Sequence, residues 1–224
     1  MAWPKLLVLV RHAESKSNVL SANERASFET APHTYPLTER GRQQAAVTAA
    51  YLQRRFGRFD TRYTSYYGRA KETMEILCPG EKYCEDPRLA EAQRGIWHAM
   101  TRDEIRERFP EEIRRRDREG FYHHRPIGGE NWPDVELRIR SFLDTLTRDH
   151  AGARVLLVVH SHWLVLCQRL IHGYSIEECV RRYREQLVEN ASVTAYAGHD
   201  PWLFGRPSLE LTLDAVVPWK DLLP

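Results

Sequence analysis

The stretch LLVLVRHAESKSN, from Leu6 to Asn18, places five apolar residues directly before Arg11 and His12. Such a short, continuous run of leucine and valine is typical of a strand buried on both faces, as in a parallel sheet covered by helices. A strand that merely ends in a turn is usually followed by glycine, asparagine or proline, and it has no need of a cation beside an imidazole. The stretch therefore predicts a core strand and makes Arg11 and His12 candidates for a reaction site at its end.

A second core strand carries the same signal. The segment VLLVVHSHWL places the apolar residues 155–159 directly before His160. In open α/β sheets, ligands bind beyond the carboxyl ends of the strands. A single histidine there is more simply a turn or capping residue. Two of them, each after a core strand, favour a shared site if the strands are neighbours.

The rest of the chain alternates helices with strands. Apolar residues spaced three and four apart indicate an amphipathic helix over 134–148, and Thr38 is an N-cap candidate for a helix that reaches about Phe56. Further helices are expected over 69–77, 101–109 and 164–171, and strands over 63–66, 192–196 and 208–214. We therefore expect one α/β domain over 1–224, a three-layer α/β/α sandwich with a mostly parallel central sheet. Residues 94–132 are expected to form a small cap over one end of that sheet.

Composition excludes several classes of protein. With 33 basic and 31 acidic residues the net charge is +2, too balanced to predict a nucleic-acid or membrane partner. The four cysteines form neither a CxxC pair nor a metal-ligand spacing, so reduced thiols are expected. No apolar run approaches the ~18 residues of a membrane span, and Arg11 interrupts the only apolar run near the N-terminus, unlike a signal peptide. The expected location is the cytoplasm.

Two further segments add an arginine and a carboxyl group. In TSYYGRAKET (64–73), Arg69 opens a predicted helix. The helix dipole mildly disfavours a cation at that position, so an anionic partner is indicated. In RLAEAQRGIW (88–97), Glu91 lies in a short loop and is uninformative by itself.

Taken together, two arginines, two histidines and a carboxyl group suit phosphoryl transfer. Guanidinium groups match phosphate oxygens in bidentate geometry. A neutral imidazole is a good nucleophile, and a second imidazole can donate to the transferring group. A protonated carboxyl can protonate the leaving oxygen. The set is coherent for phosphoryl transfer through a phosphohistidine.

Seven blocks resemble, in order and over nearly the whole chain, the histidine phosphatase superfamily, in the branch that contains cofactor-dependent phosphoglycerate mutases and fructose-2,6-bisphosphatase. They are RHAESKSN, PLTERGRQQA (36–45), TSYYGRAKET, RLAEAQRGIW, GGENWPDVELR (128–138), VLLVVHSHWL and NASVTAY (190–196). The resemblance implies a phosphoglycerate mutase-like fold and His12 as the nucleophile. It implies that Arg11, Arg69 and His160 hold the phosphoryl group. It also implies that Asn18 lies in the loop that closes the pocket and that Glu91 is the proton donor, with a raised pKa.

The sequence departs from the family pattern at several points. Ala13 replaces the glycine of the first motif, and Ser161 replaces the glycine after the second histidine. In HSH, the strand length favours His160 as the phosphate ligand and His162 as a pocket-wall residue. The candidate substrate-binding residues are Asn18, Ser161, His162, Arg25, Tyr122 and Arg125, where Arg25 belongs to a long loop after Asn18. A simple packed turn is an equal reading of Tyr122 and Arg125.

The charged run 111–120 has two readings. One is a lid that attracts anions. The preferred reading is a solvated helix with i,i+4 ion pairs such as Glu111–Arg115 and Glu112–Arg116.

The sequence favours a metal-independent phosphatase acting on a small phosphorylated metabolite and releasing inorganic phosphate. The segment RPIGGENWPDVELR (125–138) is closer to the bisphosphatase-like pattern than to the mutase pattern. The first alternative is a phosphoglycerate mutase primed by 2,3-bisphosphoglycerate. The second is a non-catalytic phosphate-binding module, although such a module has no need of Glu91, whose charge repels phosphate. Both a monomer and a homodimer are compatible with the sequence.

Overall fold

A central sheet organises the molecule. The computed structural model describes residues 2–21, 23–24, 31–186, 188–199 and 208–223. Its six strands lie in the order β3-β2-β4-β1-β5-β6. They are β1 (Leu6–Arg11), β2 (Thr61–Thr64), β3 (Cys84–Glu85), β4 (Arg154–Val159), β5 (Val193–His199) and β6 (Ser208–Val216). The first four pair in parallel, whereas β5 runs antiparallel to both of its neighbours. The predicted mostly parallel sheet is confirmed.

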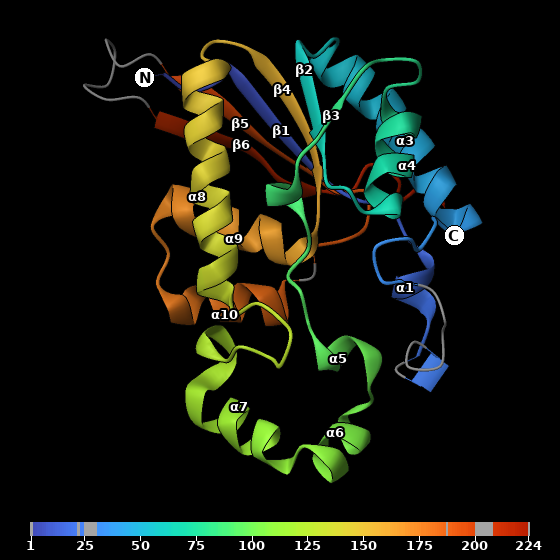
Figure 1. Ribbon diagram of the computed structural model, residues 1–224. Coiled ribbons are helices and arrows are strands. Elements are labelled where there is room, and N and C mark those ends of the chain that lie inside the picture. The colour runs from blue at the N-terminus through green and yellow to red at the C-terminus, as the bar shows by residue number, and fades with distance from the viewer. Residues whose placement is uncertain (1, 22, 25–30, 187, 200–207, 224) are drawn as a thin grey trace.

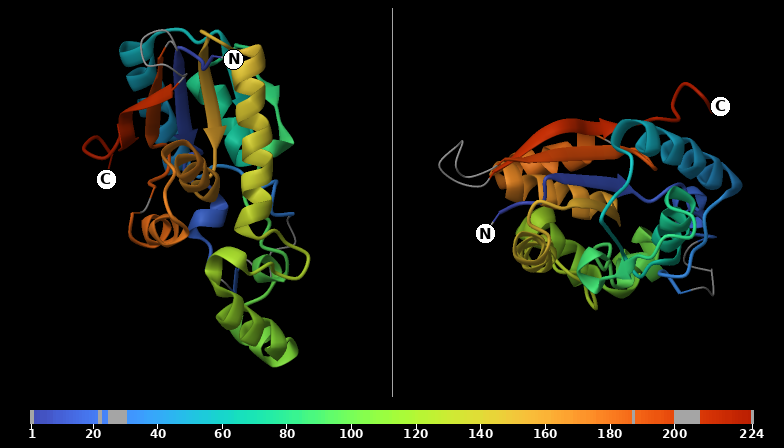
Figure 2. Two further views of the ribbon diagram at one scale, coloured as in Figure 1. Left: turned by 90° about the vertical axis from the view of Figure 1, so that its left-hand side faces the viewer. Right: turned by 90° about the horizontal axis from the view of Figure 1, so that it is seen from above.

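Helices cover both faces of this sheet (Figures 1 and 2). One layer contains α3 (Glu39–Phe56) and α4 (Gly68–Leu77), and the other contains α8 (Trp132–Asp149), α9 (Ser161–His172) and α10 (Ile176–Glu185). Because successive side chains of a strand point to opposite faces, Leu7 and Leu9 pack toward α8 and α9, and Val8 and Val10 pack toward α3 and α4. Burial on both faces explains why β1 reads as a continuous apolar run.

Most predicted elements are present with small shifts at their ends. The hydroxyl of Thr38 accepts a hydrogen bond from the Gly41 N–H at 2.9 Å, so α3 has the predicted N-cap. The strand expected over 63–66 lies two residues earlier, at 61–64. Helix α10 was not predicted, although Ile176, Val180 and Tyr183 have the spacing of an apolar helix face.

The cap segment 94–132 contains three helices, which lie together at one end of the molecule in Figure 1. They are α5 (Ile96–Ala99), α6 (Arg102–Arg108) and α7 (Pro110–His123). The expected solvated helix is present as α7 and has one i,i+4 ion pair, Arg115–Glu119 at 3.6 Å, but the two pairs named from the sequence are absent. Glu111 pairs with Arg114, and Glu112 pairs with Arg115 at 3.3 Å. This i,i+3 pairing leaves Arg116 without an ion-pair partner among the described residues.

Composition led us to expect reduced thiols and no membrane-spanning segment. Cys78, Cys84, Cys167 and Cys179 are all free. Across the described ranges, no helix combines the length and apolar character needed to cross a membrane.

Candidate active site

Two parallel neighbours in the sheet place the two histidines side by side. Arg11 at the end of β1 is in register with Val159 at the end of β4. The next residue on each strand is a histidine, and the ring centroids of His12 and His160 lie 5.0 Å apart. His160 is also the N-cap residue of α9. The convergence predicted from the two apolar runs is therefore present.

The backbone around His12 is held by three separate segments. The Asn190 side chain donates to the His12 carbonyl at 2.9 Å, and the Ala13 N–H donates to the Thr73 hydroxyl at 3.0 Å. The His12 N–H donates to the Val159 carbonyl at 2.9 Å. Sequence reasoning assigned no role to Asn190 or Thr73, which fix the position of the histidine without lining the cavity above it.

Hydrogen bonds determine which nitrogen of each imidazole carries the proton. His12 Nδ1 lies 2.8 Å from the Ala13 carbonyl, to which it can only donate. Its Nε2 accepts a hydrogen bond from Arg69 Nε at 3.1 Å, so Nε2 is unprotonated and its lone pair points toward Arg69, another residue that lines the cavity. Arg69 cannot accept, so the 3.3 Å contact between its terminal nitrogen and His160 Nδ1 places the His160 proton on Nε2.

Both imidazoles are neutral at neutral pH. Burial is the main cause that lowers the pKa of His12 well below its ordinary value, and the charge of Arg69 lowers it further. The pKa of His160 is lowered well below its ordinary value by the same two causes in the same order. A neutral His12 with an unprotonated Nε2 is in the protonation state that a nucleophile needs.

The site contains buried donors that have no acceptor. His160 is fully buried, and its Nε2 has no hydrogen-bond partner in the described part of the chain; the same is true of Arg11 Nε. Arg69 is buried and lies over the ring of Tyr67 at 4.4 Å. An unpartnered buried donor is costly. Two such donors beside the buried Arg69 guanidinium therefore indicate a site for an anion with several acceptor oxygens.

Glu91 lies at the other side of the same cavity, next to His162. Glu91 Oε1 is 3.2 Å from His162 Nδ1 and accepts from the Ala92 N–H at 3.0 Å, and Oε2 is 3.5 Å from the Ser161 hydroxyl. Burial by itself raises the pKa of Glu91. Its proximity to His162, His160 and the Ala92 N–H outweighs burial and holds the pKa well below its usual range. The expectation of a raised pKa is therefore wrong for the ligand-free site, because sequence reasoning did not place His162 against this carboxylate.

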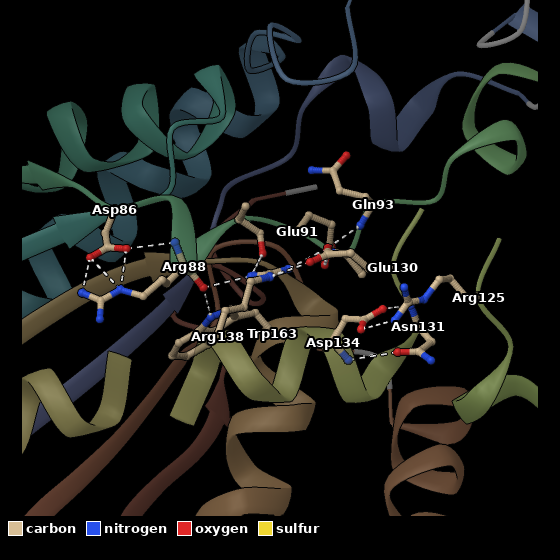
Figure 3. A network of polar contacts seen from close by, with 12 residues as sticks. Asp86, Arg88, Glu91, Gln93, Arg125, Glu130, Asn131, Asp134, Arg138 and Trp163 are labelled. Carbon is tan, nitrogen blue, oxygen red and sulfur yellow. Dashed lines mark hydrogen bonds and ion pairs between the residues drawn. The ribbon is translucent and has the colours of Figure 1, made fainter. Parts of the chain in front are cut away.

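The loop that carries Glu91 is held by Arg138 of α8 (Figure 3). Arg138 donates to the carbonyls of Arg88 at 2.9 Å and Ala90 at 2.7 Å, and it pairs with Glu130 at 3.0 Å. Trp163 of α9 donates to the same Arg88 carbonyl at 2.9 Å. Both carbonyls precede Glu91 in the chain, and Glu130, the ion-pair partner of Arg138, accepts from the Gln93 N–H beyond it. Arg138 therefore positions the carboxyl group without touching it.

Close backbone packing explains the second glycine of GGENWPDVELR, and a φ of +71° explains the first. The Glu130 N–H donates to the Gln93 carbonyl at 2.8 Å, and the Gln93 N–H donates to the Glu130 carboxylate at 3.0 Å. A Cβ atom on Gly129 would lie 2.5 Å from the Gln93 carbonyl oxygen. Only glycine allows the backbone at 129 to approach Gln93 this closely. The contact fastens the segment before α8 to the loop that carries Glu91.

Replacing Arg138 with methionine is expected to lower the free energy of unfolding by about 2 kcal/mol, because a partly buried charge-assisted network is lost and Glu130 is left unpaired. We also expect kcat to fall about tenfold or more, because Glu91 loses its position. Urea unfolding and steady-state kinetics measure the two effects. Arg148 on the same helix pairs with Asp149 at the surface, so Arg148→Met is the control and should change stability by less than about 0.5 kcal/mol. Equal effects of the two substitutions would contradict the positioning role.

Most of the predicted site residues line one cavity of about 300 Å³. Those that line it are Arg11, His12, Asn18, Arg69, Glu91, Ser161 and His162. His160 lies beneath them against Arg69. Asn18 caps the short helix α1 (Lys16–Val19), where its Oδ1 accepts from the Ser15 N–H at 2.9 Å.

Two predicted substrate-binding residues are placed otherwise. Tyr122 does not line this cavity, because its hydroxyl donates to Glu136 at 2.7 Å within the core. Arg125 also lies outside it, because its guanidinium pairs with Asp134 at the start of α8. The packed-turn reading therefore fits both residues better than a contact with the leaving group. Arg25 lies outside the described residues.

Several cavity residues were not predicted. Tyr67, Gln93, Arg94 and His98 line the cavity together with Ser17 and Tyr183. Tyr183 belongs to the unpredicted helix α10, whose apolar spacing was the available signal. In the ranges that the structure describes, no three His, Cys, Asp or Glu side chains are grouped so that they could hold a metal ion.

Comparison with known proteins identifies the class to which this fold and site belong. The sequence model of the histidine phosphatase superfamily (branch 1) matches residues 7–201. The chain therefore belongs to the histidine phosphatase superfamily, a family of enzymes, as the ordered motifs indicated.

Its curated relatives include both phosphatases and mutases. The chain is 31% identical to the 6-phosphofructo-2-kinase/fructose-2,6-bisphosphatase of Gallus gallus over 70% of its own length, but it spans only 30% of that protein. It is 31% identical to phosphoserine phosphatase 1 of Hydrogenobacter thermophilus, over 69% of this chain and 70% of the relative. It is 32% identical to the 2,3-bisphosphoglycerate-dependent phosphoglycerate mutase of Parvibaculum lavamentivorans, over 72% of this chain and 77% of the relative.

Solved structures show the same fold. YhfR of Bacillus stearothermophilus superimposes with a TM-score of 0.75 at 28% identity, covering 95% of this chain and 97% of that one. A putative alpha-ribazole-5'-P phosphatase of Escherichia coli superimposes with a TM-score of 0.75 at 20% identity, covering 96% and 98% of the two chains. The central sheet with its helices is therefore the phosphoglycerate mutase-like fold that the sequence predicted.

Proposed function

We propose that the chain is a metal-independent phosphatase that hydrolyses a small phosphomonoester through a phosphohistidine on His12. The observation that carries the proposal is the arrangement of the two imidazoles around Arg69. His12 presents a lone pair on Nε2, while His160 presents a buried N–H that has no acceptor among the described residues. A phosphoryl group between them meets a nucleophile on one side and hydrogen-bond donors on the other.

The first step transfers the phosphoryl group to the enzyme. The substrate phosphate displaces the Arg69 N–H from His12 Nε2, which then attacks phosphorus in line. The N–P bond forms as the P–O bond to the leaving group breaks. Arg11, Arg69 and His160 hold the equatorial oxygens, where negative charge is spread in the transition state.

Glu91 serves as the acid and then as the base. The carboxylate is ionised in the ligand-free site, so it must take up a proton when the substrate binds. The negative charge of the phosphate raises the pKa of a neighbouring carboxyl and so favours that protonation. The proton passes to the leaving oxygen, and Glu91 then accepts a proton from the water that cleaves the N–P bond. Inorganic phosphate is released, and neutral His12 is regenerated.

Replacing Glu91 with glutamine is expected to slow hydrolysis of an alkyl phosphate about 100-fold. p-Nitrophenyl phosphate should slow by less than about tenfold, because its leaving group needs little protonation. Steady-state kinetics with both substrates in EDTA tests this. Glu75→Gln is the control, because Glu75 is an exposed carboxylate on α4 that accepts from Tyr83. Equal slowing of both substrates by Glu91→Gln would contradict the acid role.

A mutase is the second candidate, because a phosphoglycerate mutase is among the relatives at 32% identity. Incubation of the wild-type chain with 3-phosphoglycerate and 2,3-bisphosphoglycerate separates the two functions. Release of inorganic phosphate from a panel of phosphomonoesters supports the phosphatase, whereas isomerisation without net release supports the mutase. Binding of phosphate with neither reaction would support the binding-module alternative.

A further inference from the structure

The catalytic cavity continues into the cap. Gln93, Arg94 and His162 line both the cavity above His12 and a smaller neighbouring hollow. That hollow in turn shares Arg116, Trp97 and Phe121 with a distal cavity of about 270 Å³. The three cavities therefore adjoin one another, from the phosphoryl site past Trp97 and Phe121 to the space between the cap and α10.

Arginines from separate elements converge on the distal cavity. Arg102 begins α6, Arg116 lies in the middle of α7, and Arg184 lies near the end of α10. Burial lowers the pKa of Arg116, and the charges of Arg102 and Arg94 lower it further. Arg184 acts in the same direction. Asp117 acts in the opposite direction, so Arg116 lies among three like charges and one carboxylate.

Neighbouring arginines on the same helices, unlike those at the distal cavity, form ion pairs. On α7, Arg114 and Arg115 pair with Glu111 and Glu112. On α10, Arg181 and Arg182 both pair with Glu178, at 2.8 and 2.9 Å. Arg102, Arg116 and Arg184 face the distal cavity and have no ion-pair partner in the part of the chain that the structure describes.

The carboxylates near the path do not neutralise these arginines. Asp117 is the acidic residue among those lining the distal cavity, and it forms no ion pair within the described ranges. Glu130 lines the intermediate hollow, but its carboxylate is already bound by Arg138 and by the Gln93 N–H. Three arginines against one aspartate leave the distal cavity positively charged.

Aromatic rings hold two of the guanidinium groups by their faces. Arg116 lies over the Trp97 ring at 4.4 Å, and Arg184 lies over the Phe121 ring at 5.3 Å. Trp97 is itself fixed, because its indole N–H donates to Glu112 at 3.3 Å. A guanidinium stacked by its face keeps its N–H edge free for a planar or tetrahedral anion.

We propose that this distal cavity, lined by Arg102, Arg116 and Arg184, binds a second anionic group of the substrate. The inference rests on the proposed function and deepens it. The preferred substrate is then an elongated phosphomonoester with a phosphate or carboxylate at the end remote from His12. Aromatic side chains of the cap contact the part between the two charged ends.

The test compares substrates that differ only in their second charge. α,ω-Alkyl bisphosphates and ω-carboxyalkyl phosphates of increasing chain length are compared with the matching alkyl monophosphates. In the wild-type chain, kcat/KM should peak at one chain length and exceed that of the monophosphate about tenfold or more. The bisphosphate and carboxylate series distinguish the two anionic groups. No preference for a second charge in either series overturns the inference.

Two variants and two matched controls locate the effect. In Arg116→Gln and Arg184→Gln, the ratio of kcat/KM between the doubly and singly charged substrates should fall about tenfold, through KM. Arg114→Gln and Arg181→Gln alter the ion-paired neighbours on the same helices and should leave the ratio within about twofold. An unchanged ratio in the first pair, or an equal fall in all four, overturns the inference.

A binding measurement separates this inference from the proposed function. Alkyl bisphosphonates cannot be hydrolysed, so calorimetry with them reports on the distal cavity even if the chain turns over no substrate. Binding about tenfold weaker in Arg116→Gln than in Arg114→Gln supports the second anion site. Equal binding overturns it. Absence of any phosphomonoester hydrolysis would instead count against the proposed phosphatase alone.

Discussion

The His12→Ala variant is expected to lose phosphomonoester hydrolysis by about 10⁴-fold or more, because the group that forms the covalent intermediate is gone. The position of His12 makes this the largest single effect. Its Nδ1 is committed to the Ala13 carbonyl at 2.8 Å, and its Nε2 is the nitrogen that faces Arg69. The neighbouring His160 cannot substitute, because its Nδ1 accepts from Arg69 and its Nε2 carries the proton.

The intermediate is tested by trapping it. Brief incubation with a labelled phosphomonoester, followed by denaturation in alkali, should leave label on the wild-type chain, because a phosphoramidate survives alkali and is lost in acid. No label should remain on His12→Ala. His150→Ala is the control, because His150 bonds to Tyr63 at 2.8 Å away from the cavity and should keep full labelling. Label on His12→Ala would place the phosphoryl group on another residue.

The Arg69→Gln variant is expected to lower kcat/KM about 100- to 1,000-fold, because a buried cation that faces the transferring group is removed. It should also change the pH dependence. The charge of Arg69 is, after burial, the second cause that lowers the pKa of His12. Without it that pKa rises, so His12 becomes protonated at a higher pH. The acid limb of kcat/KM should therefore move toward neutral pH in the variant.

The conservative variant Arg69→Lys separates charge from shape. A lysine keeps a positive charge beside His12, so the acid limb should stay close to that of the wild type. It lacks the planar fork that reaches both imidazoles, so kcat/KM should still fall about tenfold or more. Profiles of kcat/KM against pH for the wild type, Arg69→Gln and Arg69→Lys test both expectations. An acid limb that stays in place in Arg69→Gln would show that another group sets it.

The prediction of the site succeeded where local pattern and sheet geometry are enough. The runs before His12 and His160 predicted two core strands, and parallel pairing brings their ends together. Arg69 was predicted at the start of a helix, and it lies there against both imidazoles. The ordered motifs indicated the family, which the match over residues 7–201 confirms.

The predictions were wrong where a side chain has more than one possible partner. On α7, sequence spacing allowed Glu111 and Glu112 to pair at i,i+4, but both pair at i,i+3, and Arg116 lines the distal cavity. Tyr122 looked like a pocket residue, but its hydroxyl turns to Glu136 on α8. The pKa of Glu91 was expected to be raised and is lowered, because His162 lies 3.2 Å away.

The sequence by itself determined the class of fold, the family and the residues at the ends of its core strands, because apolar runs and the direction of parallel strands constrain the backbone. Only the tertiary structure decided the partner of each charged side chain. Arg138 reaches the Arg88 and Ala90 carbonyls, just before Glu91, from 50 and 48 residues away in the chain, and His162 of α9 meets the Glu91 carboxylate. Such pairings depend on how α8 and α9 pack against the loop that carries Glu91, and no local periodicity in the sequence specifies that packing.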